Sequence, residues 1–343
     1  MHPDRRGEGI ILFGLGVLDA EQARFDQALD HYRRSLAIFA ELDDRWWQAH
    51  ALQRLGELHW EQAQLDQAVA ALEQSVAIFR ALGDRHGQAM ALRSLALTFD
   101  HQGRYDDALT GYQACLAKFR ELGDRLREAA TLQNLGFLYR EQGRLDAAQA
   151  CYQQCLGMFR EFGDRRFEAT TLRSLGDVCC EQDRLHDALG WLEQSLALFR
   201  ELGDRRFEAL ALRTLGDVHR KAGRHPQALA CLQECLGSCR QLGDRRIEGY
   251  ALRSIGDLLA EQHHLDDALD HYQRALTAFS ELGLPLWQGR TLECIADAHT
   301  VRGDQPAAQQ AWKQAATILA RLGVPTAAEV RRASGGPPAG AEC

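Results

Sequence analysis

Lysine is scarce in this sequence: only three of the 40 basic residues are Lys, at positions 118, 221 and 313. The rest are Arg, a bias that we take as the mark of a GC-rich bacterial gene. The formal net charge of −8 argues against nucleic acid as a partner, because binding to phosphates needs an excess of basic residues. No apolar run approaches the roughly 20 residues that a membrane-spanning helix needs. We therefore expect a cytoplasmic protein that does not bind membranes.

The short motifs of catalysis are also missing. We find no nucleophile motif, no glycine-rich phosphate loop and no paired carboxylates beyond those of the repeat described below. Ten cysteines are present without a Cys-x-x-Cys pair, and in a chain without a convincing signal peptide we expect reduced thiols. We therefore predict a protein that is not an enzyme and has no metal or cofactor. A thiol or metal role stays open as a third hypothesis, and it would require metal bound to the purified protein.

What the sequence does contain is a repeat. The tetrapeptide Leu-Gly-Asp-Arg recurs in one phase, with neighbouring copies 40 residues apart. It stands at 82–85, 122–125, 202–205 and 242–245, with near copies at 42–45 and 162–165 and altered versions at 282–285 and 322–325. A fixed period in the range of about 20–50 residues indicates a stacked repeat array. Such a chain grows by adding units rather than by adding separate cores.

Each unit predicts two helices joined by a tight turn. Asp84 can cap the first helix of its unit, and Leu95 and Phe99 follow at helical spacing on the face to be buried. Tyr105 opens the second helix, and Gly123 ends it because Gly tolerates a left-handed backbone. Neither helix can bury its apolar stripe alone, so the units must stack.

Small residues recur where the helices must approach closely. One series is Gly16, Gly56, Ala96, Gly136, Gly176, Gly216, Gly256 and Ala296, and a second is Ala28, Ala68, Ala108, Ala148, Ala188, Ala228, Ala268 and Ala308. Cys115, Cys155 and Cys235 stand at a third position, which other units fill with Ser or Ala. Since Cys behaves as a small hydrophobic residue in protein cores, we expect these cysteines to pack rather than to react.

One family matches this pattern. Leu135-Gly136, followed by Tyr139, Gly143, Ala148 and Tyr152, resembles the tetratricopeptide repeat. The usual unit has about 34 residues, and the 40-residue unit is similar to a longer branch that includes Pins-type adaptors and the repeat tails of bacterial AfsR- and NB-ARC-like regulators. The resemblance implies an all-α, right-handed superhelical solenoid of eight helix-turn-helix repeats over residues 1–322. We expect a short closing helix at 323–333 and a disordered tail at 334–343.

In this family the first helix of each unit lines a concave groove that binds peptides. The resemblance places a ladder of Arg and Asp on that face, formed by Arg173, Asp177, Arg213, Asp217, Arg253 and Asp257. The same face would carry Trp60, Arg93, Gln133, Asn134, Phe137, Arg140 and Arg220. Arg is a fork of donors suited to carboxylates and peptide carbonyls, and Asp accepts backbone N–H groups. The alternative is a solvated face on which Arg and Asp pair only with each other.

The resulting hypothesis is a non-catalytic scaffold that holds a protein or peptide in this groove. The alternative is a ligand- or peptide-sensing module of a bacterial signalling or transcriptional regulator whose effector domain is on another segment or chain. Some family members grip a C-terminal carboxylate with Lys and Asn at these positions. Arg and Asp stand there in this sequence, so that specificity is not carried over.

The first repeat is unusually apolar. Ile10, Phe13 and Val17 stand where most later units carry polar residues. A terminal repeat that faces solvent should be polar. We therefore expect these three residues to contact a partner or a second copy, which would give a homodimer through the N-terminal repeat. A frayed apolar end is the alternative.

Overall fold

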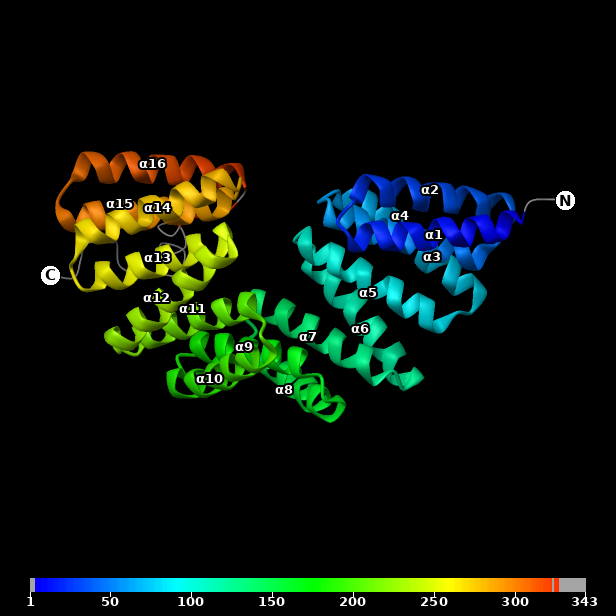
Figure 1. The fold of residues 1–343 in the computed structure, drawn as a ribbon, viewed down its shortest axis with the longest axis horizontal. Helices are drawn as coiled ribbons and strands as arrows, with labels where there is room; N and C mark the ends of the chain where they lie inside the picture. Colours follow the sequence, from blue (N-terminus) through cyan, green and yellow to red (C-terminus); the bar gives the residue numbers. More distant parts are fainter. Residues whose placement is uncertain (1–3, 323, 327–343) are drawn as a thin grey trace. The chain divides into compact units, whose positions relative to one another are not determined.

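The fold is built from one kind of regular element. The computed structural model describes residues 4–322 and 324–326, in which all the regular secondary structure is α-helical (Figure 1). The helices are α1 Arg5–Glu21, α2 Phe25–Glu41, α3 Arg45–Glu61, α4 Leu65–Leu82, α5 Arg85–His101, α6 Tyr105–Leu122, α7 Arg125–Glu141, α8 Leu145–Phe162, α9 Arg165–Glu181, α10 Leu185–Leu202, α11 Arg205–Lys221, α12 His225–Leu242, α13 Arg245–Glu261, α14 Leu265–Glu281, α15 Pro285–Arg302 and α16 Gln305–Arg321. Odd-numbered helices are the A helices of the repeats and even-numbered ones the B helices. The predicted all-α class and helix-turn-helix repeats are confirmed.

The helices pack in chain order within each of two compact units. Unit 1 is Met1–Asp164 and unit 2 is Arg165–Cys343. In both units an A helix packs on the B helix of its own pair, as α3 does on α4. A B helix then packs on the A helix of the next pair, as α12 does on α13, and neighbouring A helices such as α11 and α13 also touch. The apolar stripes are therefore buried between stacked helices, as the repeat pattern predicts.

The helix ends form as the tetrapeptide predicts. The carboxylate of Asp84 accepts the backbone N–H of Gly87 at 2.8 Å, and the matching aspartates of most other A helices do the same. Gly83 and Gly123 end their B helices with φ of 70° and 67°. The A-to-B turns need the same left-handed conformation even where the residue is not Gly. Ala63 and His263 adopt it with φ of 58° and 61°.

The small residues lie where helices touch, as predicted. A Cβ built on Gly136 would stand 2.7 Å from the Tyr152 ring, which is too close for any real contact. Repeat three carries Ala96 at this position and compensates with Gly111 on the facing helix, where an added Cβ would meet the Cβ of Ala96 at 2.9 Å. Cys155 and its two equivalents are fully buried, which fits the packing role expected for them.

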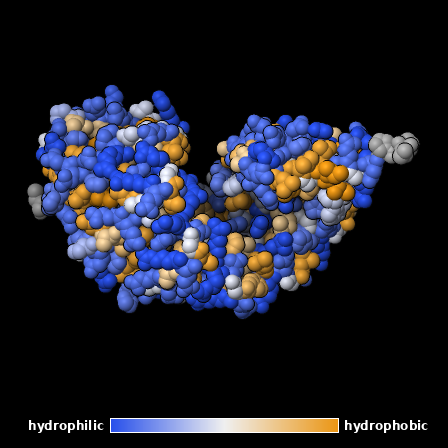
Figure 2. All heavy atoms as spheres, in the orientation of Figure 1, coloured by the Kyte–Doolittle hydropathy of each residue, from blue (hydrophilic) through white to orange (hydrophobic). Residues whose placement is uncertain are grey.

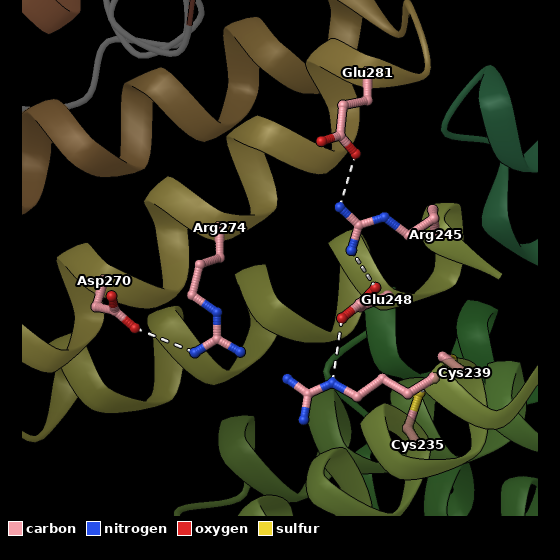
Figure 3. A network of polar contacts seen from close by, with 8 residues as sticks. Cys235, Cys239, Arg245, Glu248, Asp270, Arg274 and Glu281 are labelled. Carbon is pink, nitrogen blue, oxygen red and sulfur yellow. Dashed lines mark hydrogen bonds and ion pairs between the residues drawn. The ribbon is translucent and has the colours of Figure 1, made fainter. Parts of the chain in front are cut away.

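Ion pairs join the end of a B helix to the start of the next A helix. Nε of Arg200 donates to Glu208 at 2.9 Å. A second set of ion pairs lies within one repeat. Figure 3 shows Arg245 at the start of α13 between two carboxylates, donating to Glu248 on the same helix at 2.6 Å and to Glu281 at the end of α14 at 2.7 Å. The acidic residues near the A-helix starts therefore act across repeats as well as on their own helix terminus.

The C-terminal prediction falls mostly on residues that the structure does not describe. Of the expected closing helix at 323–333, only residues 324–326 are described, and they are not helical. The expected tail at 334–343 lies outside the described residues. Among the helices described here, none is long and apolar enough to cross a membrane.

Candidate functional site

The predicted Arg–Asp ladder of unit 2 lies on α9, α11 and α13. Nη1 of Arg213 donates to Asp217 at 2.8 Å, and the side chains of both residues are 23% exposed. Arg173 and Asp177 stand one helical turn apart in the same way, with a closest N–O distance of 3.6 Å. Asp257 accepts its hydrogen bond from a different helix: the Tyr272 hydroxyl on α14 donates to it at 2.8 Å. The pairing within a helix that the sequence left as an alternative is therefore present, and the two formed pairs are electrically neutral.

Aromatic rings of the next repeat cover part of this ladder. The guanidinium of Arg213 lies 5.8 Å from the centroid of the Tyr250 ring. The guanidinium of Arg253 lies 5.2 Å from the centroid of the Trp287 ring. Contacts of this kind are worth about 0.5–2 kcal/mol, the larger values where water is excluded. Arg213 is thus held between Asp217 on its own helix and Tyr250 on the following A helix, and Arg253 lies against Trp287 on the following A helix. These contacts restrict the rotamers of both arginines.

Four arginine N–H groups on this face have no acceptor. Nε of Arg173, Arg213, Arg253 and Arg220 is buried and lacks a hydrogen-bond partner within the described part of the chain. A buried donor without an acceptor costs about 1–3 kcal/mol. A small change of rotamer that turns these groups toward a ligand oxygen would recover that energy. Arg220 is also ion-paired with Glu261 of the next repeat.

In unit 1 the predicted residues form a more apolar surface on α3, α5 and α7. The Trp60 ring lies 4.9 Å from the ring of His101 on the next A helix. Phe137 is 46% exposed, and the guanidinium of Arg140 lies 5.6 Å from its ring centroid. Arg140 also pairs with Glu141 at 3.3 Å. The remaining predicted residues of this unit, Arg93, Gln133 and Asn134, are half-buried on the same helices.

Sequence reasoning missed a carboxyl group on this surface. Asp100 is half-buried at the repeat position that Trp60 and Arg140 occupy in their own units. Burial and then the charge of Glu141 raise its pKa to about 6. The 40-residue equivalence with Trp60 and Arg140, both predicted as site residues, could have pointed to Asp100.

The apolar residues expected to contact a partner at the N-terminus are placed differently by the structure. The Phe13 ring packs on Tyr32 at 5.6 Å and on Trp47 at 5.3 Å between centroids, and Val17 packs against the same cluster. Both side chains are thus used inside their own chain, and replacing Phe13 would damage the fold rather than test a contact. Ile10 alone of the three is exposed, at 37%.

The cysteines lie in the helical packing. No group of three or more His, Cys, Asp or Glu side chains is arranged to hold a metal among the residues with described positions. Sγ of Cys235 lies 3.9 Å from Sγ of Cys239 inside α12, and both residues are buried (Figure 3). Burial raises the pKa of Cys115 to about 12, which keeps that thiol protonated at neutral pH.

Comparison with known proteins places this chain in a family. The family model for the tetratricopeptide repeat matches residues 7–81, 47–121, 87–161, 127–201, 167–241 and 207–281. Together these overlapping matches cover well over half of the chain, so the chain belongs to the tetratricopeptide repeat family. None of the curated proteins matches it.

Several solved structures are similar in fold. Aspartyl phosphate phosphatase F from Bacillus subtilis has a TM-score of 0.67 at 12% identity, over 83% of this chain and 75% of its own. The apo form of RapI has a TM-score of 0.65 at 17% identity, over 80% of this chain and 99% of its own. The Rap conjugation gene regulator of the plasmid pLS20, in complex with the Phr* peptide, has a TM-score of 0.63 at 13% identity, over 87% and 84%. At these identities the likeness establishes the fold and nothing finer.

Proposed function

We propose that this chain is a non-catalytic scaffold that binds a peptide, or an extended segment of a partner protein, on the A-helix face. The observation that carries the proposal is the row of arginines at 173, 213 and 253, whose Nε–H groups are buried and find no acceptor among the residues that the structure describes. Unsatisfied buried donors are uncommon in folded proteins and call for an explanation. A ligand that brings oxygen atoms to successive repeats supplies one.

The charge balance of the ladder favours peptide backbone as the ligand. Arg213 and Asp217 form a neutral pair that offers N–H donors beside carboxylate acceptors. A peptide backbone offers the complementary combination, a C=O acceptor beside an N–H donor, and it carries no net charge. A strongly acidic ligand would meet Asp177, Asp217 and Asp257 as well as the arginines. The ladder of unit 2 therefore suits an extended chain whose side chains are not predominantly acidic.

A sensing role is the second candidate function. One of the similar structures is named as a conjugation gene regulator and holds a peptide called Phr*. By analogy, a peptide bound along the A helices of this chain would change how neighbouring repeats pack and so signal to an effector domain on another segment or chain. This hypothesis needs the same ladder and adds a conformational response to binding.

The proposal is tested with an array of short synthetic peptides probed by the full chain. Wild type is compared with the triple variant R173Q/R213Q/R253Q, which keeps a polar side chain and removes the guanidinium groups. R274Q is the matched control, because Arg274 pairs with Asp270 one helical turn away on α14, at 3.2 Å. We expect the triple variant to lose the peptides that wild type and R274Q retain. An unchanged set of bound peptides in the triple variant would place binding on another surface.

A further inference from the structure

The first helix of the chain exposes an apolar face. Ile11 is 64% exposed, Leu18 51% and Leu15 40%. Their spacing of four and three residues puts them on one side of α1, together with Gly14. We call Ile11, Gly14, Leu15 and Leu18 the end face. Figure 2 shows hydrophobic residues gathered on the part of the surface where α1 lies in Figure 1.

In later repeats the positions of Ile11, Leu15 and Leu18 are covered by the preceding repeat. We compare residues at the position of Leu15 in repeats that follow another helix pair of the same compact unit. Each of them is at most 8% exposed: Leu55, Leu95, Leu135, Leu215, Ile255 and Ile295. Packing of a B helix on the next A helix provides this cover, as α4 does for α5. The end face is thus the kind of surface that is buried between repeats elsewhere, and no repeat in the described part of the chain covers it.

The end face does not match a repeat stacked in the usual phase. The position of Ile11 holds only Ala or Thr in later repeats, and each of these is fully buried: Ala51, Ala91, Thr131, Ala211, Ala251 and Thr291. A stacked repeat in the usual register leaves no room there for Ile. The last described helix, α16, does not match the end face either, because it carries Gln309 where α14 uses Leu269 to pack against the next repeat. Head-to-tail stacking of two chains would bury the Gln309 amide against the apolar end face.

Gly14 shows what kind of surface fits. It lies inside a helix, where Gly is less favourable than Ala. A Cβ added to it would meet nothing within 4 Å. The fold therefore gives no reason for Gly here, and later repeats carry larger residues such as Arg54, Ser94 and Asn134 at this position. The absent side chain leaves a hollow at the centre of the apolar face.

We propose that a second copy of this chain covers the end face, with the two α1 helices packed antiparallel about a twofold axis between Gly14 and Leu15. In this register Leu15 of each copy enters the hollow at Gly14 of the other. Ile11 of each copy then lies opposite Leu18 of the other, so the face is complementary to itself, as a twofold interface requires. The end face carries no charge. Its rim is acidic, and this register brings Glu8, which is paired with Arg5 at 2.8 Å, opposite Glu21 of the other copy. This dimer is independent of peptide binding on the A-helix face.

Sedimentation velocity of the full chain over a range of concentrations tests the dimer. We expect wild type to dimerise, and we expect L15Q and G14L each to raise the Kd for dimerisation about tenfold or more, because a symmetric contact loses the change twice. G14L fills the hollow while improving helix propensity, so its helix content and melting should not fall. L202Q is the matched control, since Leu202 is 44% exposed at the end of α10 and lies far from α1 in sequence.

Three results would overturn the proposal. A wild type that stays monomeric at every concentration would show that a second copy does not cover the end face. This conclusion would hold even if another protein were found to bind there. A dimer that survives both L15Q and G14L lies elsewhere. If L202Q weakened dimerisation as much as L15Q does, the loss would be a general effect of a more polar surface rather than of the end face. R173Q/R213Q/R253Q should leave the dimer unchanged, which separates failure here from failure of the peptide site.

Discussion

At the residue scale, Asp100 is the carboxyl group whose charge the fold resists most clearly. Burial and the neighbouring Glu141 raise its pKa to about 6, against about 3.9 for Asp in an unfolded chain. Below both pKa values the group is protonated in both states and has no effect on stability. As the pH rises through that interval the unfolded chain ionises first, so stability falls, and it remains lower above about pH 6.

Replacing Asp100 by Asn should therefore stabilise unit 1 near neutral pH and change little at acidic pH. We expect a gain of about 1 kcal/mol at pH 7, discounted from the full pKa shift because the carboxyl group is only half-buried. Urea unfolding at pH 7 and at pH 3.5 measures the difference. E73Q is the control, because Glu73 is exposed on α4. Equal gains for D100N at both pH values would contradict an electrostatic cause.

The sequence could predict some of these residue roles and not others. The capping aspartates follow from the tetrapeptide because a cap depends only on local backbone geometry. Gln48 shows the limit: it reaches the Phe39 carbonyl at 2.8 Å, whereas Glu208 at the same repeat position accepts from Arg200. Gln can donate to a carbonyl oxygen and Glu cannot, and the Glu contact also needs an Arg eight positions earlier. In both cases the partner lies on the preceding helix, outside the local geometry of the cap. The contacts of Arg213 with Tyr250 and of Arg253 with Trp287 were not predicted, because the side-chain packing between neighbouring A helices decides which ring meets a guanidinium. The position of Trp287 holds an aromatic residue in other repeats as well, namely Trp47, Phe167 and Phe207.

At the scale of the helices, the closest approaches decide which substitutions the fold accepts. Gly136 on α7 faces the Tyr152 ring on α8, whereas Gly157 on α8 has no neighbour within 4 Å of an added Cβ. The sequence predicted a small residue at the first position from its series. It could not predict the exchange between Ala96 and Gly111, because that requires knowing which residues face each other across the pair.

These two glycines give a matched pair of variants. G136A should destabilise the protein by about 1–3 kcal/mol, because the new methyl group overpacks the contact with Tyr152. G157A should instead stabilise it by about 0.5–1 kcal/mol, because Ala is the better helix former. Denaturant unfolding of both variants measures the two signs. Similar changes for both would mean that helix propensity alone governs these positions.

The turns between A and B helices offer a second element-scale test. Ala63 holds a φ of 58°, where a Cβ is strained, while Gly103 and Gly143 fill the same position without that cost. We expect A63G to raise the melting temperature, with a gain of about 0.5–1 kcal/mol after the added flexibility of the unfolded chain is counted. Calorimetry compares it with A40G, at the end of α2, where Gly should destabilise. A loss of stability in A63G would show that the turn is not strained.

At the scale of the whole molecule, the repeat period predicted the helix pairs because each pair uses the same local rules. The division into two units at Asp164 was not predicted, since the Phe-Gly-Asp-Arg stretch there is as regular as its neighbours. The ladder residues came from the period together with the family resemblance. The period could not predict how these residues are paired. Each Arg–Asp pair that forms is neutral, and its arginine keeps a buried Nε–H donor without an acceptor in the described part of the chain.

The most direct test of this account is a titration of the tightest peptide from the array, labelled for fluorescence anisotropy. Wild type, R173Q/R213Q/R253Q and R274Q are compared at one ionic strength. If the arginines at 173, 213 and 253 hold the peptide backbone, the triple variant should bind about 100-fold more weakly, at roughly 1 kcal/mol for each lost hydrogen bond. R274Q should match wild type. Equal affinity of the triple variant and wild type would contradict the assignment of the A-helix face as the binding site.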